Sequence, residues 1–141
     1  MSLYDNIYYA GYFDGEGCIR IQVNKNNSLT MPQHILFCSI SSNNKDICES
    51  YKLSFGGSVI EAHYKKAGKT FWQWHIASNK AKSFLHTLEP FLKQKRHEAL
   101  IAVSFQQNRG ALGFAQREDV RRQLHVLKNN NKELKDYAKF I

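Results

Sequence analysis

The stretch YAGYFDGEG at residues 9–17 constrains the fold of this chain more than any other part of its sequence. Residues 3–13 are apolar or aromatic on nearly all sides, which predicts a helix that is buried on more than one face. Gly11 and Gly15 stand four residues apart, hence on one helix face, where missing side chains let a second backbone approach closely. Because glycine within a helix costs about 1 kcal/mol relative to alanine, the pair indicates a helix–helix contact.

Two carboxylates, Asp14 and Glu16, stand where this helix ends. The helix macrodipole disfavours negative charge at a C-terminus, and a bound divalent cation is the obvious compensation. Oxygen ligands alone suit Mg²⁺ rather than zinc. The alternative is a simple D-G-E-G turn in which Asp14 caps locally and Glu16 is solvated. A calcium loop is disfavoured, because Arg20 and Gln22 occupy its later ligand positions.

The length of 141 residues suits one domain with a single core, so any second half of the protein comes from another copy or a partner. The chain carries 20 Lys and Arg against 12 Asp and Glu, a formal net charge of +8. Such a balance is typical of proteins that bind polyphosphates, including nucleic acids, although charge alone decides nothing.

The three cysteines, Cys18, Cys38 and Cys48, are odd in number and lack the close pairs of zinc sites. We interpret them as buried, reduced thiols, which favours a reducing compartment. No charged-then-apolar leader opens the sequence, and no apolar run approaches the roughly 20 residues that span a bilayer. We therefore expect a soluble intracellular protein of the cytoplasm or an organelle matrix, with no membrane partner.

Residues 18–24 alternate strictly between apolar and polar side chains, which predicts a half-buried strand. Its core face would carry Ile19, Ile21 and Val23, and its polar face Arg20, Gln22 and Asn24. A polar turn at 25–28 and a second strand at about 33–41 complete an antiparallel hairpin.

The remaining pattern predicts one more hairpin and several helices. Ser42-Asn43-Asn44 offers an N-cap for a helix over 46–55 that ends at Gly56-Gly57. Strands follow at 58–64 and 70–77 around a turn at 65–69. A helix at 78–88 is capped by Ser78-Asn79 and stopped by Pro90. Further helices are predicted at 93–106 and 117–128, before a tail that starts at Asn129. This order predicts an α+β fold with a four-stranded antiparallel sheet.

The nonapeptide resembles the signature of the LAGLIDADG homing endonucleases. Ala10, Gly11, Asp14 and Gly17 match it, and Glu16 stands at its metal-binding acidic position, whereas four positions depart from the literal motif: Tyr9, Tyr12, Phe13 and Gly15. Three further stretches resemble family segments in the right order: CIRIQV, FGGSV at 55–59 and TLEPFLKQKRHEA at 87–99. The resemblance covers about residues 3–105.

The resemblance implies an αββαββα core with a saddle-like sheet over about residues 3–106, plus a C-terminal helical extension over about 114–141 for which it does not account. A chain with one signature is expected to form a homodimer through the signature helix, on a long target with approximate two-fold symmetry. The interface is expected at Ile7, Ala10, Gly11, Asp14 and Gly15.

The resemblance also assigns catalytic roles for the hydrolysis of a phosphodiester. Glu16 and the carbonyl of Gly15 are expected to hold Mg²⁺, with Mn²⁺ as a substitute and Ca²⁺ supporting binding only. Lys95 aligns with a basic residue near the scissile phosphate; the alternative is an ordinary helix-surface lysine. Ser42, or Ser41 if the register slips, stands where the family often has a water-organising glutamine; the alternative for Ser42 is the helix N-cap.

Double-stranded DNA is expected on the polar face of the sheet, because a two-stranded ribbon fits the major groove. Arg20, Gln22 and Asn24 are the clearest base-reading candidates. Trp72, Trp74 and Ile76 share one face of their strand and indicate core, which leaves Gln73 and His75 for DNA; the register of 58–64 stays open. Phosphate contacts are expected from lysines in the hairpin turns, with a solvated turn as the alternative: Lys25, Lys65, Lys66 and Lys69.

Arg117, Arg121 and Arg122 on the last helix either contact the DNA backbone or keep that surface soluble. Two other classes of function remain open beside the site-specific endonuclease. One is a protein of the same fold that binds DNA or intron RNA without cutting, as a maturase or regulator. The other is a basic α+β domain without a nucleic-acid role.

Overall fold

The computed structural model describes residues 2–24, 32–64 and 68–138. Its first part runs through α1 (Leu3–Glu16), β1 (Gly17–Asn24), β2 (Gln33–Ser42), α2 (Lys45–Phe55), β3 (Ser58–His63) and β4 (Thr70–Ala77). The helices α3 (Ser78–Leu88), α4 (Arg96–Asn108) and α5 (Phe114–Ala138) follow, with 3₁₀ turns at Glu89–Phe91 and Arg109–Ala111. The order confirms the predicted α+β class and the αββαββα core. No helix among the described residues is long and apolar enough to cross a membrane.

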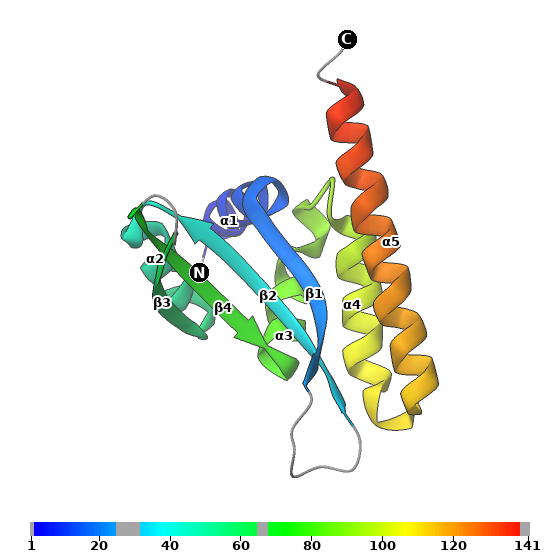
Figure 1. The fold of residues 1–141 in the computed structure, drawn as a ribbon. Helices are drawn as coiled ribbons and strands as arrows, with labels where there is room; N and C mark the ends of the chain where they lie inside the picture. Colours follow the sequence, from blue (N-terminus) through cyan, green and yellow to red (C-terminus); the bar gives the residue numbers. More distant parts are fainter. Residues whose placement is uncertain (1, 25–31, 65–67, 139–141) are drawn as a thin grey trace.

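The four strands form one antiparallel sheet in the order β1-β2-β4-β3. The helices α1, α2 and α3 lie behind this sheet in Figure 1, while α4 and α5 run alongside the edge strand β1, with α5 packed on α4. One face of the sheet is therefore covered by helices, and we call the other, which faces the viewer in Figure 1, the open face.

The covered face carries the hydrophobic core. In β1 the predicted alternation is confirmed: Ile19 and Ile21 are buried, whereas Arg20 is exposed. The neighbouring strands contribute Leu36, Cys38, Ile40, Trp74 and Ile76 to the same core. Trp72, Trp74 and Ile76 thus share the core side of β4, as predicted, because side chains alternate along a strand.

An aromatic cluster joins the helices to this face. Tyr51 of α2 is fully buried and lies 4.9 Å from Trp74 between ring centroids. Its hydroxyl donates a 2.7 Å hydrogen bond to the carbonyl of Tyr9, so α2 is tied to the backbone of α1. Burial raises the pKa of Tyr51, which keeps this hydroxyl a donor.

The turn between α2 and β3 depends on two glycines. Gly56 and Gly57 adopt φ of +85° and +86°, a region that glycine occupies without strain. The Trp74 ring nitrogen donates a 2.8 Å hydrogen bond to the Gly56 carbonyl, and a Cβ at Gly57 would overlap the carbonyl of His75. This close approach fixes β3 and α2 against β4.

Several predicted boundaries and caps differ from the structure. Ser78 and Asn79 do not cap α3, which has Ala77 at its N-cap without a side-chain hydrogen bond and begins at Ser78 with φ +56°. The fourth helix begins at residue 96 rather than 93, because the preceding backbone N–H groups bind another helix. The run at Asn129 does not end α5, which continues to residue 138, since asparagine is only a weak helix breaker.

The second hairpin now has a defined register. Ile60 pairs with Gln73, and Glu61 pairs with Trp72. Directly paired residues point to the same side of a sheet, so Ile60 lies on the open face and Glu61 on the covered side. Glu61 and His63 nevertheless stay exposed, because β3 is the edge strand and extends past the core.

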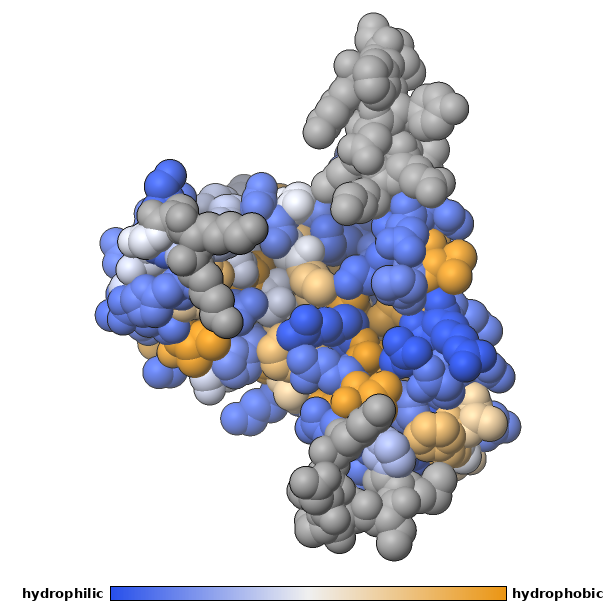
Figure 2. Space-filling model, viewed as in Figure 1, coloured by the Kyte–Doolittle hydropathy of each residue, from blue (hydrophilic) through white to orange (hydrophobic). Residues whose placement is uncertain are grey.

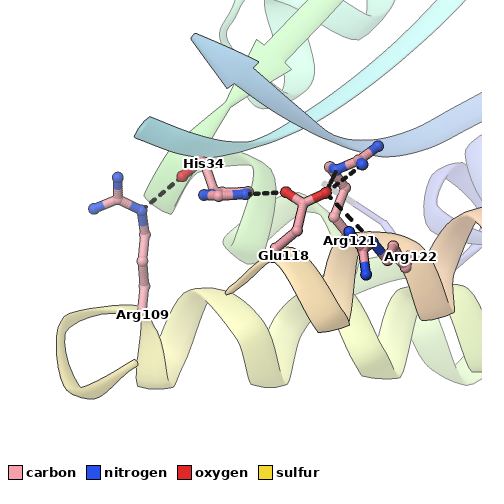
Figure 3. Close-up of polar contacts among 5 residues, drawn as sticks. All are labelled: His34, Arg109, Glu118, Arg121 and Arg122. Carbon is pink, nitrogen blue, oxygen red and sulfur yellow. Dashed lines mark hydrogen bonds and ion pairs between the residues drawn. The ribbon is translucent and has the colours of Figure 1, made fainter. Parts of the chain in front are cut away.

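A contact between a buried histidine and a carboxylate attaches α5 to the sheet (Figure 3). His34 of β2 is fully buried, and its Nε2 lies 2.7 Å from a carboxylate oxygen of Glu118 in α5. Hydrogen bonds from Arg121 and then His34 lower the pKa of Glu118 to about 2. Arg109 donates a 2.9 Å hydrogen bond to the carbonyl of His34, so both ends of the α4–α5 connection are fastened to β2.

Candidate active site and nucleic-acid face

Glu16 is the last residue of α1 and is exposed to solvent. The next residue opens β1, and a Cβ at Gly17 would overlap the ring of Phe13, so the abrupt change from helix to strand needs a glycine there. Phe13 itself is fully buried in the core. Glu16 has no hydrogen-bond or ion-pair partner among the described residues, so its carboxylate is available for a ligand.

The carboxylate of Asp14, unlike that of Glu16, is engaged by hydrogen bonds within the chain. Its Oδ2 accepts hydrogen bonds from the backbone N–H groups of Lys93 at 3.2 Å and Gln94 at 3.0 Å, and its Oδ1 accepts from that of Lys95 at 2.8 Å. A carboxylate at the N-terminus of a helix is stabilised by unpaired N–H groups and by the helix dipole. Asp14 therefore joins the end of α1 to the start of α4.

Lys95 occupies the N-cap position of α4, and only 9% of its surface is exposed. Its ammonium group donates a 2.7 Å hydrogen bond to the backbone carbonyl of Asp14, two residues before Glu16. The cation thus offsets the negative end of the α1 dipole beside the exposed acid. This burial rules out the alternative of an ordinary helix-surface lysine.

The glycine-bearing face of α1 is open. No heavy atom outside the local helix backbone lies within 4 Å of a Cβ built on Gly11 or Gly15. The same side of the helix exposes Tyr4 at 82%, Ile7 at 46% and Tyr8 at 58%. We call these five residues the α1 face; an exposed apolar surface with glycines is typical of a contact with another helix.

Two residues that the sequence assigned to the interface lie elsewhere. Ala10 is fully buried in the chain's own core, and the Asp14 carboxylate is engaged by α4. Helical periodicity explains this difference, because residues 10 and 14 lie about 100° from residues 11 and 15 around the helix axis.

The end of β2 requires a correction. Ser42 pairs with Trp72 and shares the covered side of the sheet, whereas Ser41 pairs with Gln73 on the open face. The hydroxyl of Ser42 accepts a 3.0 Å hydrogen bond from the N–H of Asn44, which is the actual N-cap of α2. Ser41 therefore takes the position considered for Ser42, and its hydroxyl lies 3.5 Å from the amide nitrogen of Gln73.

The open face carries the predicted polar row. Arg20, Gln22 and Asn24 alternate with the buried residues of β1, and Gln73 and His75 share their side of the sheet through the β2–β4 pairing. Lys69 is exposed in the second hairpin turn, where its carbonyl accepts the N–H of Tyr64 at 3.0 Å. The other predicted phosphate contacts lie outside the described residues: Lys25, Lys65 and Lys66.

Tertiary structure adds residues to this face that sequence reasoning missed. The ammonium group of Lys128 in α5 lies 3.0 Å from the sulfur of Cys18, which shares its side of β1 with Arg20. Phe37 also lies on the open face, opposite Arg20. The period-2 pattern of β2 could have identified Phe37, but no local signal links Lys128 to a strand 110 residues earlier.

The last-helix arginines have intramolecular partners instead. Arg117 donates a 2.7 Å hydrogen bond to the carbonyl of Arg109. Arg121 hydrogen-bonds to Glu118, and Arg122 lies 3.7 Å from the same carboxylate. The Arg117 contact ties α5 to the preceding turn, whereas the Arg121 and Arg122 contacts lie within α5 itself. Among the described side chains of α5, Lys128 is a cation that contacts β1.

The donor set fits half of an oxygen-ligand metal site. Among the described residues no cluster of three or more His, Cys, Asp or Glu side chains could hold a metal. One chain offers the Glu16 carboxylate and, at the exposed Gly15, a backbone carbonyl near the end of α1. Hard oxygen donors of this kind suit Mg²⁺, and further ligands must come from another molecule.

The fold and the site together describe an α+β protein in which a glycine-bearing helix ends in an exposed acid, directly before the edge strand of an open sheet. A family model described as LAGLIDADG endonuclease matches residues 9–103. Since this match covers more than half of the chain, the protein belongs to the LAGLIDADG endonuclease family. A comparison with the curated proteins found no match.

Solved structures agree with this fold. The homing endonuclease I-CvuI, in complex with its target and Ca, is similar with a TM-score of 0.65 at 18% identity, over 93% of this chain and 82% of that one. The archaeal intron-encoded homing endonuclease I-Vdi141I, complexed with DNA, gives 0.65 at 15% over 92% and 83%. The LAGLIDADG meganuclease I-AabMI, bound to uncleaved DNA, gives 0.63 at 22% over 87% and 43%.

Proposed function

We propose that this protein is a homodimeric, divalent-metal-dependent homing endonuclease that cuts both strands of a long, pseudo-palindromic DNA target. The observation that carries the proposal is the combination of an open, apolar α1 face with a single available carboxylate, Glu16, at the end of the same helix. One chain is thus an incomplete site with a surface suited to pairing.

Pairing through the α1 face would complete the site. The missing side chains at Gly11 and Gly15 let two helix backbones approach closely, and Tyr4, Ile7 and Tyr8 would bury apolar surface around them. With the two-fold axis running along the paired helices, the C-terminal ends of both helices would come together, and with them two copies of Glu16. The same symmetry accounts for a target with two similar half-sites.

The residues at the end of α1 have distinct chemical roles. Glu16 and the Gly15 carbonyl would hold Mg²⁺ or Mn²⁺, which when bound lowers the pKa of a nucleophilic water and stabilises the leaving 3′ oxygen. The Lys95 ammonium would offset negative charge that develops on the scissile phosphate. Ser41, at the end of β2 on the open face, would orient water at the site.

The open face would read the target. A two-stranded ribbon fits the major groove, which is about 12 Å wide, and Arg, Gln and Asn side chains pair with guanine and adenine edges. Arg20, Gln22 and Gln73 lie on this face, and the amide nitrogen of Gln73 lies 3.5 Å from the Ser41 hydroxyl. Lys69 and Lys128 stand at its margins for phosphate contacts.

The test is cleavage of a duplex that spans the insertion site of the protein's own reading frame. Wild type with Mg²⁺ is expected to give fragments with short 3′ overhangs, and Glu16→Gln to cut at least about a hundredfold more slowly while binding normally in Ca²⁺. Asp119→Asn, which removes an exposed acid from α5, is the matched control and should cut normally.

Two results would contradict the proposal. If Glu16→Gln cut as fast as wild type, the acid would be misassigned. If wild type bound the duplex tightly but cut neither strand with Mg²⁺ or Mn²⁺, the protein would be a non-cutting DNA- or intron-RNA-binding member of the family, acting as a maturase or regulator.

A further inference from the structure

The centre of the open face is not simply polar. Arg20 in β1 pairs with Phe37 in β2, and His75 in β4 is the diagonal neighbour of Phe37, because His75 pairs with Ser39. The three side chains form a row across three strands. The guanidinium carbon of Arg20 lies 4.6 Å from the centroid of the Phe37 ring. On the other side, the rings of Phe37 and His75 are stacked with centroids 5.3 Å apart and planes 23° from parallel.

Apolar groups continue on both sides of this row. Ile35 precedes Phe37 by two residues in β2 and shares its side of the sheet, and Ile60 of β3, exposed at 44%, pairs with Gln73. Figure 2 shows hydrophobic residues between hydrophilic ones across the middle of this face. The face thus alternates apolar surface with hydrogen-bonding groups.

The stacking leaves only the outer edge of the Phe37 ring open to a ligand. Arg20 covers one side of the ring and His75 the other, and side chains stand roughly perpendicular to a sheet. A single-stranded base that needs a free aromatic face to stack on, as in many RNA-binding sheets, therefore finds none at Phe37. The outer edge of the ring remains, with the Arg20 fork of N–H donors beside it.

These two groups match two features of a duplex. In the major groove the 5-methyl of thymine is the apolar group on the base edges, and guanine O6 and N7 together accept the two parallel hydrogen bonds of an arginine. The distance of 4.6 Å between the guanidinium carbon of Arg20 and the centroid of the Phe37 ring is close to the rise of one base pair, about 3.4 Å. Neighbouring base pairs can therefore meet the two residues at once.

We propose that Phe37 forms a thymine-methyl subsite and that the same ring holds Arg20 in position to read an adjacent guanine. This inference rests on the proposed function, because it takes duplex DNA as the ligand of the open face. The stacked guanidinium loses less freedom on binding than a free one, which increases its selectivity for guanine.

The test is selection of binding sites in Ca²⁺ from two randomised duplex libraries, one made with thymine and one with uracil in its place. Wild type is expected to select a thymine beside a guanine in each half-site of the first library. In the second library it should show no preference for uracil at the same position. In a selected site, replacing that thymine by uracil should weaken binding about fourfold, the effect of one buried methyl group of about 0.8 kcal/mol.

Two variants separate the two parts of the subsite. Phe37→Ser removes the apolar contact and should abolish the thymine preference in the first library. Phe37→Leu keeps an apolar side chain but no ring, so the thymine preference should persist while guanine selection at the neighbouring position falls at least about threefold. A thermal melt of each variant verifies its fold, and Phe37→Leu still tests the ring if Phe37→Ser does not fold.

The outcomes distinguish this inference from the proposed function. If neither library enriches any sequence for wild type, site-specific DNA binding itself fails. If sequences are enriched but the preferred base is retained with uracil, the methyl contact is overturned while the function stands. If Phe37→Leu selects guanine as strongly as wild type, the ring does not position Arg20 and that half of the inference is overturned.

Discussion

Lys95 donates two hydrogen bonds to Asp14. The Lys95 ammonium donates to the Asp14 carbonyl at 2.7 Å, and the Lys95 backbone N–H donates to the Asp14 carboxylate at 2.8 Å. These bonds connect the C-terminus of α1 to the N-terminus of α4, so each helix end satisfies unpaired groups of the other. The exposed acid Glu16 follows this junction directly and takes its position from it.

Lys95→Met is expected to slow cleavage about a hundredfold with little effect on binding in Ca²⁺. The methionine keeps the length of the buried stem but removes the positive charge beside the proposed site of phosphate hydrolysis. Single-turnover cleavage and a binding titration measure the two effects separately. Lys93→Met, which removes an exposed charge two residues earlier, is the control and should cut normally. Normal cleavage by a folded Lys95→Met protein would leave Lys95 a structural role only.

Gly11→Leu should prevent dimer formation without damaging the protomer. A Cβ at this position meets no described heavy atom outside the local helix backbone within 4 Å, and replacing a helical glycine favours the helix by about 1 kcal/mol. In a dimer packed through the α1 face, the same side chain would separate the two backbones. Sedimentation velocity at micromolar concentration, with a thermal melt beside it, measures both effects.

Gly110→Leu provides the control for this dimer experiment, because its Cβ is equally open but lies far along the chain, between α4 and α5. It should sediment as wild type does. A Gly11→Leu protein that remained dimeric and cut DNA would place the interface on another surface.

Glu118→Gln should destabilise the fold at neutral pH, with a difference that disappears in acid. Arg121 and His34 lower the pKa of Glu118 from 4.5 to about 2. A depressed carboxyl pKa stabilises the folded state above the unfolded value of 4.5, and this contribution is lost as the pH falls toward 2. Urea unfolding midpoints of wild type and Glu118→Gln at pH 7, 4 and 2.5 measure how the difference in stability decreases with pH. Asp119→Asn, the exposed neighbour, should show no such gap at any of these pH values.

Lys128→Gln should weaken binding of all duplexes to a similar degree. The Lys128 ammonium lies 3.0 Å from Cys18, and sulfur is a weak acceptor that leaves the other two N–H donors for a phosphate. Loss of one phosphate contact lowers the slope of log affinity against log salt by about 1. Fluorescence anisotropy over a salt series measures the slope, and Lys80→Gln on α3 is the control that should leave it unchanged. A changed base preference with an unchanged slope would argue for base contact instead.

Local patterns in the sequence predicted much of the fold. The strict alternation of β1 determined which of Ile19 and Arg20 faces the core, because a strand has only two sides. The glycine turn after α2 was also readable, since its positive φ angles are a backbone geometry that few residues allow. The four-residue spacing of Gly11 and Gly15 placed both on one open helix face. The nonapeptide alone thus located the end of α1 and the candidate acid.

Tertiary structure decided what local pattern could not. Asp14 and Glu16 are both acids at one helix end, and only the approach of α4 shows that Asp14 is occupied and Glu16 is available. Whether Ser41 or Ser42 lies on the open face depended on the strand register, because a shift of one residue moves every side chain of a strand to the other side of the sheet. Lys128 reaches β1 only because α5 docks on β2 and α4, a contact between distant segments that no local signal in the sequence encodes.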